Sequence, residues 1–297
     1  MSGNTILVTG GSGQVGGAAA RVLAGLGQVV APGRDQLDLA SAASIQAVMR
    51  EVQPRWVVNA AAHTAVDKAE NEPELAFALN ADAPRVIGEE ARKIGAAVIH
   101  FSTDYVFDGS KATPYVESDP TGPLNVYGKS KLAGEQALAQ TGAVHFIFRT
   151  SSVYGAMGKN FLRSILRMAR EREVLRIVSD QHGAPTWSED LARLTAHVIG
   201  QVDASDAGGG SGVYHAGGSG ETTWFGFASA AVDALRRREP GSKLADVEAI
   251  STAEYPTPAR RPANSRLNCA KLERTFGWRM MDWRESLEWV MDEVKVK

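Results

Sequence analysis

The sequence predicts a doubly wound α/β fold, in which helices cover both faces of a parallel sheet. Short apolar runs alternate with helical stretches through the first 150 residues, each run is apolar along its whole length, and a glycine-rich turn follows the first run. Strands without a polar face need cover on both sides, and crossover helices supply that cover in parallel sheets.

The elements of this first half follow one another as strand and helix. The predicted strands are Thr5–Thr9, Gln28–Ala31, Trp56–Asn59, Ala97–Phe101 and His145–Arg149. The predicted helices are Gln14–Leu26, Ala42–Val52, Glu74–Ile94 and Val126–Gln140. The carboxyl ends of parallel strands share one edge of the sheet, where ligands of such folds bind.

The strict alternation ends near Thr150. Further helices are predicted at Asn160–Glu171, Ser188–Gly200, Thr223–Arg237 and Trp283–Glu293. We expect residues 1–152 to form the doubly wound domain, with segments near 185–205 returning to it. Residues 153–297 are expected to form mainly a smaller C-terminal α/β domain.

Composition and charge exclude several classes of protein. Lys and Arg number 32 against 34 Asp and Glu, which leaves no broad positive charge to attract nucleic acid. No run approaches the roughly 18 apolar residues of a membrane span, and the first residues do not resemble a secretory signal. The single cysteine, Cys269, fits a reducing compartment. We therefore expect a cytoplasmic protein that binds neither nucleic acid nor membrane.

A glycine-rich turn joins the first strand to the first helix. Its glycines stand at Gly10, Gly13 and Gly16, a GxxGxxG spacing. Small residues let the backbone approach a pyrophosphate, whose charge is stabilised by the free N–H groups of a helix N-terminus. The position of the turn favours dinucleotide binding over the alternative, a tight connection between strand and helix.

The end of the second strand bears on the choice of dinucleotide. An arginine there accommodates the 2′-phosphate of NADP(H), whereas an acidic residue bonds the 2′-hydroxyl of NAD(H). Arg34 stands at this point, followed by Asp35. We therefore expect NADPH as cofactor, with NADH as an accepted alternative. A solvated loop cation is the other interpretation of Arg34.

Three polar residues are candidates for catalysis. Thr103 follows the fourth predicted strand, at the edge of the sheet where ligands bind. Tyr127 and Lys131 are four residues apart and share one face of a helix. An ammonium near a phenol lowers the tyrosine pKa toward the working range. A Tyr-x-x-x-Lys pair is common by chance, and its register with Thr103 and the glycine turn makes it informative.

Four further segments carry a resemblance to a known family. They are NAAAHTAVDKAE at 59–70, STDYVF at 102–107, PLNVYGKSKLAGE at 123–135 and YPTPARRPANSRLN at 255–268. Together with the turn and the catalytic candidates, they resemble the extended short-chain dehydrogenase/reductase family with its Rossmann-type fold. Within that family, the segments are most similar to the dTDP-4-dehydrorhamnose reductases.

The resemblance implies a reaction and a role for each catalytic candidate. The reaction is NAD(P)H-dependent reduction of the 4-keto group of dTDP-4-dehydro-6-deoxy-L-mannose to dTDP-L-rhamnose, the last step of dTDP-rhamnose biosynthesis. Thr103 would bond the ketone, Tyr127 would protonate the developing alkoxide, and Lys131 would hold the nicotinamide ribose.

Further cofactor contacts carry over by motif. They are Gly13, Gln14 and Val15 at the pyrophosphate, Asp38 and Leu39 at the adenine end, and Ala62, His63 and Thr64 near the nicotinamide ribose. His63 has a structural, hydrogen-bonded histidine as its alternative, because nothing in its spacing makes it an acid–base group.

The substrate contacts are expected from both halves of the chain. Asp104 is a candidate acceptor for a sugar hydroxyl, with a helix-cap or backbone role as its alternative. Asn160, Arg260 and Asn264 belong to donor-rich segments suited to a diphosphate. A solvated face is the alternative for the arginines around Arg260.

Two departures from the resembling chains affect the expectations. Ser152 stands where many of them have tryptophan, which keeps another NDP-4-ketosugar reductase open. Ala18 stands where some of them supply a metal-binding glutamate, although Glu189 is present. We therefore expect no metal site, and a monomer or weak homodimer without a magnesium bridge.

A rival from a different class is a catalytically silent NADP-binding regulatory subunit, like that of methionine adenosyltransferase. The complete Thr103, Tyr127 and Lys131 set argues against it.

Overall fold

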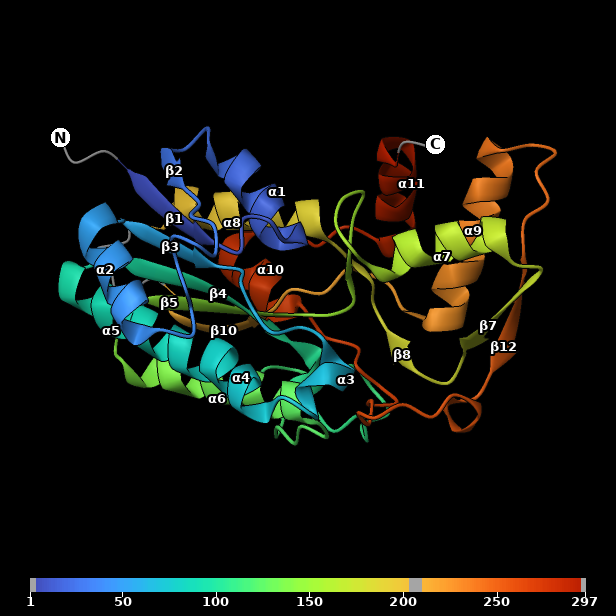
Figure 1. The fold of residues 1–297 in the computed structure, drawn as a ribbon, viewed down its shortest axis with the longest axis horizontal. Coiled ribbons are helices and arrows are strands. Elements are labelled where there is room, and N and C mark those ends of the chain that lie inside the picture. Colours follow the sequence, from blue (N-terminus) through green and yellow to red (C-terminus); the bar gives the residue numbers. More distant parts are fainter. Residues whose placement is uncertain (1–3, 203–209, 295–297) are drawn as a thin grey trace.

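The computed structural model describes residues 4–202 and 210–294, which form two units side by side (Figure 1). One unit is built on a six-stranded parallel sheet with helices on both faces. The other contains three long helices and short pairs of strands. The predicted doubly wound α/β fold is therefore confirmed. None of the helices in these ranges is long and apolar enough to cross a membrane.

The six-stranded sheet contains the five predicted strands and one more. In spatial order its strands are β10 (Gly212–His215), β5 (His145–Thr150), β4 (Ala97–Thr103), β3 (Trp56–Asn59), β1 (Thr5–Thr9) and β2 (Gln28–Val30). Every neighbouring pair is parallel. The order turns back beside β1, so β1 and β3 adjoin the crevice in which such folds bind ligands.

Two groups of helices cover the sheet. The helices on one face are α1 (Gln14–Leu23), α8 (Ser188–Gln201) and α10 (Ala270–Phe276). The helices on the other face are α2 (Ala42–Val52), α5 (Ala83–Ile94) and α6 (Val126–Gln140). Strand residues alternate between the two cores, with Ile6 and Val8 in one and Leu7 in the other. This alternation explains why the strands are apolar throughout.

One predicted helix is interrupted. The segment expected as a single helix over Glu74–Ile94 consists of α4 (Pro73–Phe77), a π turn at Ala78–Asp82, and α5. The turn places Asn80 against His63, whose backbone N–H donates to Asn80 Oδ1 at 2.8 Å. The Asn80 amide also donates to Ser130 Oγ of α6 at 2.9 Å. The π turn therefore lets the Asn80 amide bond two neighbouring segments. Hydrophobic periodicity in the sequence does not reveal this turn.

The second unit packs around its own core. Its long helices are α7 (Phe161–Glu171), α9 (Trp224–Arg238) and α11 (Trp283–Glu293), in agreement with the prediction. Its parallel strand pairs are β7 (Val174–Val178) with β12 (Asp246–Ile250) and β6 (Val153–Tyr154) with β9 (Thr186–Trp187), and β8 (His182–Gly183) pairs antiparallel with β11 (Thr222–Thr223). Asn160 caps α7 by accepting from the Arg163 N–H at 3.0 Å.

Candidate active site

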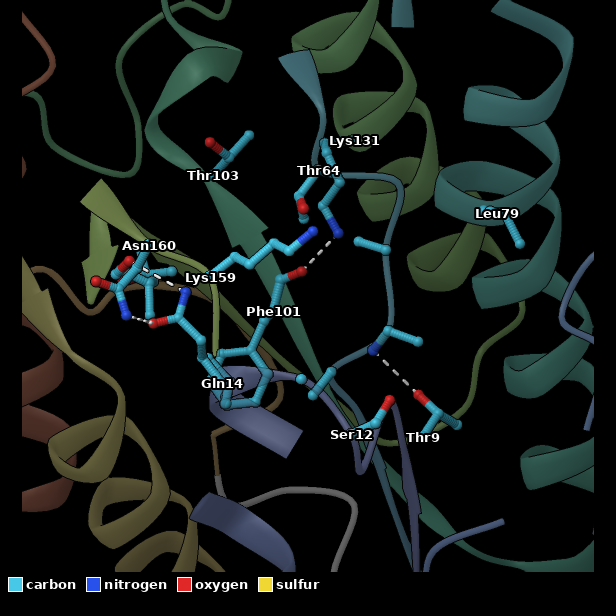
Figure 2. A pocket seen from close by; sticks show the side chains of 18 of the residues that line it. Thr9, Ser12, Gln14, Thr64, Leu79, Phe101, Thr103, Lys131, Lys159 and Asn160 are labelled. Atoms are coloured by element: carbon cyan, nitrogen blue, oxygen red, sulfur yellow. Dashed lines mark hydrogen bonds between the residues drawn. The ribbon is translucent and has the colours of Figure 1, made fainter. Parts of the chain in front are cut away.

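A cavity of about 1040 Å³ lies at the carboxyl edge of the six-stranded sheet. Its sheet wall is made by residues at or after the ends of β1, β3 and β4 and by α6. Its loop wall is made by residues 152–154 and 159–161 with Pro185, Trp224 and Phe227. Figure 2 shows side chains from both walls directed into the same space. The cavity therefore adjoins both units of the molecule.

The glycine turn forms the floor of this cavity beside β1. Gly10 has φ +69°, and a Cβ there would lie 2.9 Å from the backbone of Ala61. A Cβ on Gly16 would lie 2.2 Å from the Gly10 carbonyl oxygen. Helix α1 starts after Gly13 with no side chain capping its first N–H groups. This turn can therefore receive an anionic group at close range, because free helix N–H groups attract anions.

The residues expected to hold the cofactor mostly line the cavity. Those that do are Gly10, Gly13, Gln14, Val15, Arg34, Asp38, Leu39, Ala62, Thr64, Tyr127 and Lys131. His63 does not line it. The His63 side chain is buried, with Nε2 3.2 Å from a Glu72 carboxylate oxygen. These contacts with Glu72 and Asn80 support the structural alternative for His63, and its contact with the cofactor stays a prediction.

The three catalytic candidates meet at the end of β4. Thr103 is the last residue of β4, and its hydroxyl donates to Asp104 Oδ1 at 2.9 Å. Tyr127 lies in the first turn of α6, whose start is fixed by Asn125 accepting from the Gly128 N–H at 2.8 Å. The Tyr127 ring meets the Tyr105 ring edge-on, at 6.0 Å between centroids.

The pKa of Tyr127 differs from the sequence-based expectation. Burial raises it to about 12, and a hydrogen bond from Thr103 opposes that rise. The expected lowering by Lys131 is wrong for this state of the molecule, because the ammonium group is turned toward β4. Lys131 Nζ lies 2.6 Å from the Phe101 carbonyl oxygen and 3.2 Å from His100 Nε2 (Figure 2 shows the first contact).

Lys131 is itself strongly perturbed. Its side chain is almost fully buried between α6 and β4. Burial lowers its pKa to about 8, and the negative charge of Glu135 opposes that change. A buried amine with a pKa near the working range can exist with or without its proton.

Asp104 is a buried carboxyl group on the cavity wall. It accepts hydrogen bonds from Thr103 and from Ser151, each at 2.9 Å. Burial nevertheless raises its pKa to about 6, against those hydrogen bonds and one from Ser265. The group can accept a hydrogen bond from a polar ligand when it is ionised, and it is close enough to Thr103 to orient that hydroxyl.

The loop wall contributes one expected residue and one that sequence analysis missed. Asn160 lines the cavity, and its amide donates to Gln14 Oε1 at 3.1 Å, which ties the loop to the glycine turn. The neighbouring Lys159 also lines the cavity, and Figure 2 shows its side chain extending into it. In the sequence, the signal that could have pointed to Lys159 was its place directly after Gly158. In the structure, Gly158 has φ +72°.

The arginine-rich segment is placed differently from the expectation. Arg260 is exposed, and neither it nor Asn264 lines the cavity. Asn264 donates to the carbonyl oxygens of Lys111 and Thr113 at 2.6 and 3.0 Å, which gives it a structural role. The next arginine, Arg261, pairs with Asp67 at 2.7 Å. The Asn264 side chain therefore fastens two loops together, and the diphosphate contacts expected of Arg260 and Asn264 stay predictions.

An aromatic side chain stands near the position of the expected tryptophan. Ser152 has φ +45° and lines the cavity. Trp224, at the start of α9, lines the same cavity, and its indole N–H donates to Gln181 Oε1 at 3.1 Å. Trp224 comes from a segment more than seventy residues away, so no local pattern connected the two positions.

Glu189 is engaged in ion pairs. Its carboxylate lies 2.5 Å from Arg21 of α1 and 3.7 Å from Arg193 of α8. Within residues 4–202 and 210–294, no three His, Cys, Asp or Glu side chains are grouped as a metal site requires.

Comparison with known proteins identifies the family. Residues 4–296 match the family described as RmlD substrate binding domain. The dTDP-4-dehydrorhamnose reductase of Burkholderia thailandensis is 48% identical over 283 residues, covering 94% of this chain and 95% of that protein. The protein of the same name from Escherichia coli K12 is 44% identical, covering 97% of each chain.

Solved structures agree with these relatives. The dTDP-4-dehydrorhamnose reductase of Bacillus anthracis, in complex with NADP, superposes with a TM-score of 0.89 at 32% identity, covering 98% of this chain and 99% of that one. The corresponding enzyme of Clostridium acetobutylicum gives a TM-score of 0.90 at 34% identity and covers 98% and 100%. The chain therefore belongs to the dTDP-4-dehydrorhamnose reductase family.

Proposed function

We propose that this protein reduces the 4-keto group of dTDP-4-dehydro-6-deoxy-L-mannose and forms dTDP-L-rhamnose, with NADPH as reductant. The observation that carries the proposal is the meeting of Thr103, Tyr127 and Lys131 with the glycine turn in one cavity. Membership of the reductase family supports the same reaction.

The cavity fits a dinucleotide along its sheet wall. Gly10 and Gly16 allow the turn to pack tightly, since a Cβ on either would collide with neighbouring backbone, and the free N–H groups at the start of α1 would face a pyrophosphate. Gln14 and Val15 line the same stretch, and Arg34 stands where a 2′-phosphate would lie. When bound, the dinucleotide supplies a hydride from its nicotinamide ring. Asp38 and Leu39 would meet the adenine, and NADH remains an alternative reductant.

Tyr127 supplies the proton in this proposal. A phenol with a pKa of about 12 is protonated at neutral pH, which is the form that a general acid needs. The Thr103 hydroxyl turns from Asp104 to donate its hydrogen to the ketone oxygen and thereby polarises the carbonyl. Lys131 holds the nicotinamide ribose, while Ala62 and Thr64 line the space beside it.

The nucleotide sugar occupies the loop wall. Asp104 accepts from a sugar hydroxyl, and Asn160 keeps the loop against Gln14. Lys159 offers a positive charge to the diphosphate, and Trp224 offers an aromatic face. Charged donors suit phosphate oxygens, and aromatic rings suit a base or the apolar face of a sugar.

We propose the same division for the domains. Residues 1–152, with α8 from the segment near 185–205, hold the cofactor, and residues 153–297 hold mainly the nucleotide sugar. Helix α8 packs on α1 and shares the core of the large sheet, which supports assigning it to the first domain.

Another NDP-4-ketosugar reductase is the second candidate function. Ser152 favours it, because a serine leaves room where a tryptophan would narrow the sugar site. The nucleotide and the configuration of the sugar would then differ while the hydride and proton steps stayed the same.

A substrate panel tests both candidates. NADPH oxidation is followed spectroscopically with dTDP-4-dehydro-6-deoxy-L-mannose and with related 4-keto nucleotide sugars, and the products are identified by mass spectrometry and NMR. The proposal expects the first substrate to give the highest kcat/KM and dTDP-L-rhamnose as product. A higher kcat/KM for another sugar would favour the second candidate, and no oxidation with any of them would contradict both.

Assembly and location complete the proposal. We propose a monomer or weak homodimer without a magnesium bridge, because Ala18 offers no ligand and Glu189 is paired with Arg21. A cytoplasmic location is consistent with Cys269, the single thiol of the chain. Sedimentation and cell fractionation test these two statements.

A further inference from the structure

A buried chain of polar side chains runs beneath the cavity from the glycine turn to Lys131. Thr9 at the end of β1 bonds Asn59 at the end of β3, at 2.7 Å between oxygens. Asn59 bonds His100 of β4 at 3.0 Å, and His100 approaches Lys131 Nζ to 3.2 Å. All four side chains are at most 2% exposed. The chain therefore links the floor of the cofactor site to the catalytic lysine without water.

The hydrogen bonds in this chain run in one donor-to-acceptor direction, from Ala61 toward Lys131. The Ala61 N–H donates to Thr9 Oγ1 at 3.2 Å, and the Thr9 hydroxyl donates to Asn59 Oδ1. This leaves the Asn59 NH₂ group facing His100 Nδ1, which must then accept. A neutral imidazole that accepts at one nitrogen carries its hydrogen on the other. The hydrogen of His100 is thus on Nε2 and points at Lys131.

This arrangement suits an uncharged lysine. An ammonium group has three donors and no acceptor, so it would oppose the Nε2–H of His100. A neutral amine instead accepts from His100 with its lone pair and donates one N–H to the Phe101 carbonyl oxygen, 2.6 Å away. Reversing the Asn59 amide would take the acceptor away from the Thr9 hydroxyl, which is buried.

We propose that His100 and Asn59 orient Lys131 so that the cofactor-free protein favours its neutral amine, and that dinucleotide binding is coupled to uptake of a proton by Lys131. The inference rests on the dinucleotide site of the proposed function. His100 and Asn59 act as positioning residues, since neither lines the cavity.

The surroundings of Lys131 are consistent with this coupling. Burial lowers the pKa of Lys131 to about 8, and burial also holds the pKa of His100 well below its usual range, so the ring is neutral. Glu135, on the same helix, is already paired with Arg149 of β5 at 2.6 Å.

The other titratable groups near this part of α6 belong to neighbouring elements. Tyr127 and Asp104 both have raised pKa values, and Asp67 of α3 (Val66–Ala69) is paired with Arg261. Phosphates and ribose oxygens would add negative charge and acceptors to the cavity, and both favour the ammonium form. One proton then moves from solvent to the lysine, with no change in electrons. The ring hydrogen of His100 moves to Nδ1 as the Asn59 amide turns over, and the Thr9 hydroxyl, which lines the cavity, then donates to a bound phosphate instead of to Asn59.

Calorimetry measures the coupled proton directly. NADPH is titrated into the protein at pH 8 in buffers with different enthalpies of ionisation, and the slope gives the protons taken up. A lysine with a pKa of about 8 that becomes fully charged takes up about half a proton at that pH. We expect this uptake to shrink at pH 6.5, where the free lysine is already charged.

Two variants distinguish proton uptake by Lys131 from proton uptake by other groups, including the 2′-phosphate of NADPH. Lys131→Met removes the uptake that we assign to it, whereas Lys129→Met on the exposed face of α6 retains it. Equal uptake in the wild type and in Lys131→Met would overturn the inference, whereas failure of NADPH to bind to the wild type would contradict the proposed function instead.

The cofactor-free protein provides an independent test that does not need NADPH. ¹⁵N NMR of labelled histidine distinguishes the two ring tautomers, with His100→Gln for assignment. Above pH 8, where the free lysine is mostly uncharged, the inference expects hydrogen on Nε2 of His100 in the free protein, and on Nδ1 after NADPH is added. Hydrogen on Nδ1 in the free protein would contradict it, whatever the binding data show.

Discussion

The two walls of the cavity are built in different ways. On the sheet wall, Thr103 and Lys131 project from a strand and a helix whose backbones are fixed by regular hydrogen bonds. On the loop wall, Lys159 and Trp224 come from separate segments that meet through side-chain contacts such as Asn160 with Gln14. The sheet wall holds groups for chemistry in one geometry, and the loop wall holds groups for recognition.

Catalysis requires more precise placement of side chains than recognition does. Proton and hydride transfer depend on placing atoms to within about half an ångström, which helices and strands achieve better than loops. Recognition of a charged, aromatic ligand tolerates more variation in the positions of the contacting side chains. Changes on the sheet wall should therefore act on rate or on pH dependence, and changes on the loop wall should act mainly on substrate affinity.

The largest expected effect is on the rate, from Tyr127→Phe. The variant loses the phenolic proton and keeps the ring against Tyr105. We expect kcat to fall by about 10²–10⁴, as is typical for loss of a general acid, with the Kd for NADPH nearly unchanged. Steady-state kinetics and a fluorescence titration measure the two quantities. A variant that keeps more than roughly half of the wild-type kcat would show that another group donates the proton.

The next largest effect is expected from Asp104→Asn, and it concerns the free energy of unfolding rather than the rate. Its folded pKa of about 6 exceeds the usual 3.8, so the folded state binds the proton more tightly. The contribution of Asp104 to the free energy of unfolding is greatest below about pH 4. It falls as the pH rises to about 6, by about 3 kcal/mol. Relative to the wild type, Asp104→Asn should become more stable over this range in urea denaturation.

Asp108 is a matched control for Asp104, because its pKa is shifted in the opposite direction. Hydrogen bonds from the Ser110 N–H and from Tyr115 lower the pKa of Asp108, which is exposed. Asp108→Asn should therefore lose stability relative to the wild type as the pH rises. Parallel pH profiles for Asp104→Asn and the wild type would contradict the raised pKa of Asp104.

The loop wall is tested by Lys159→Met. Loss of one exposed charge near the diphosphate should raise the KM for the nucleotide sugar by about 3–10-fold and leave kcat nearly unchanged. Arg260→Met is the matched control, because Arg260 is exposed but does not line the cavity. A larger effect on KM from Arg260→Met than from Lys159→Met would reverse our placement of the diphosphate.

A smaller effect is expected at the edge of the sheet wall, from Arg34→Ala. Arg34 is exposed, so its hydrogen bonds to a 2′-phosphate are weakened by solvent. We expect weaker binding of NADPH by a few-fold and unchanged binding of NADH. Titration with both dinucleotides measures the difference. Equal losses for both would mean that Arg34 does not contact the 2′-phosphate.

The smallest effect is expected from removal of metal ions. Glu189 pairs with Arg21, and Ala18 offers no oxygen ligand, so little at this position favours a magnesium ion. EDTA should change neither activity nor sedimentation. A dimer that dissociates with EDTA and re-forms with magnesium would contradict this prediction.

The sequence was most informative where function depends on local geometry. The strands, the glycine turn and the four-residue spacing of Tyr127 and Lys131 follow from backbone periodicity, so they could be predicted. The direction of the Lys131 side chain could not, because it depends on His100 and the Phe101 carbonyl oxygen across the core. Similarly, the arginine cluster suggested a phosphate site, whereas long-range pairing of Arg261 with Asp67 makes part of it structural.

Deuterium labelling shows whether hydride passes from the cofactor to C4 of the sugar. The enzyme is supplied with NADPH that carries deuterium at the transferable C4 position and with dTDP-4-dehydro-6-deoxy-L-mannose. Our account predicts one deuterium at C4 of the sugar in the dTDP-L-rhamnose formed, detected by NMR and mass spectrometry. Oxidation of NADPH without deuterium at that carbon, or deuterium at a different carbon, would contradict it.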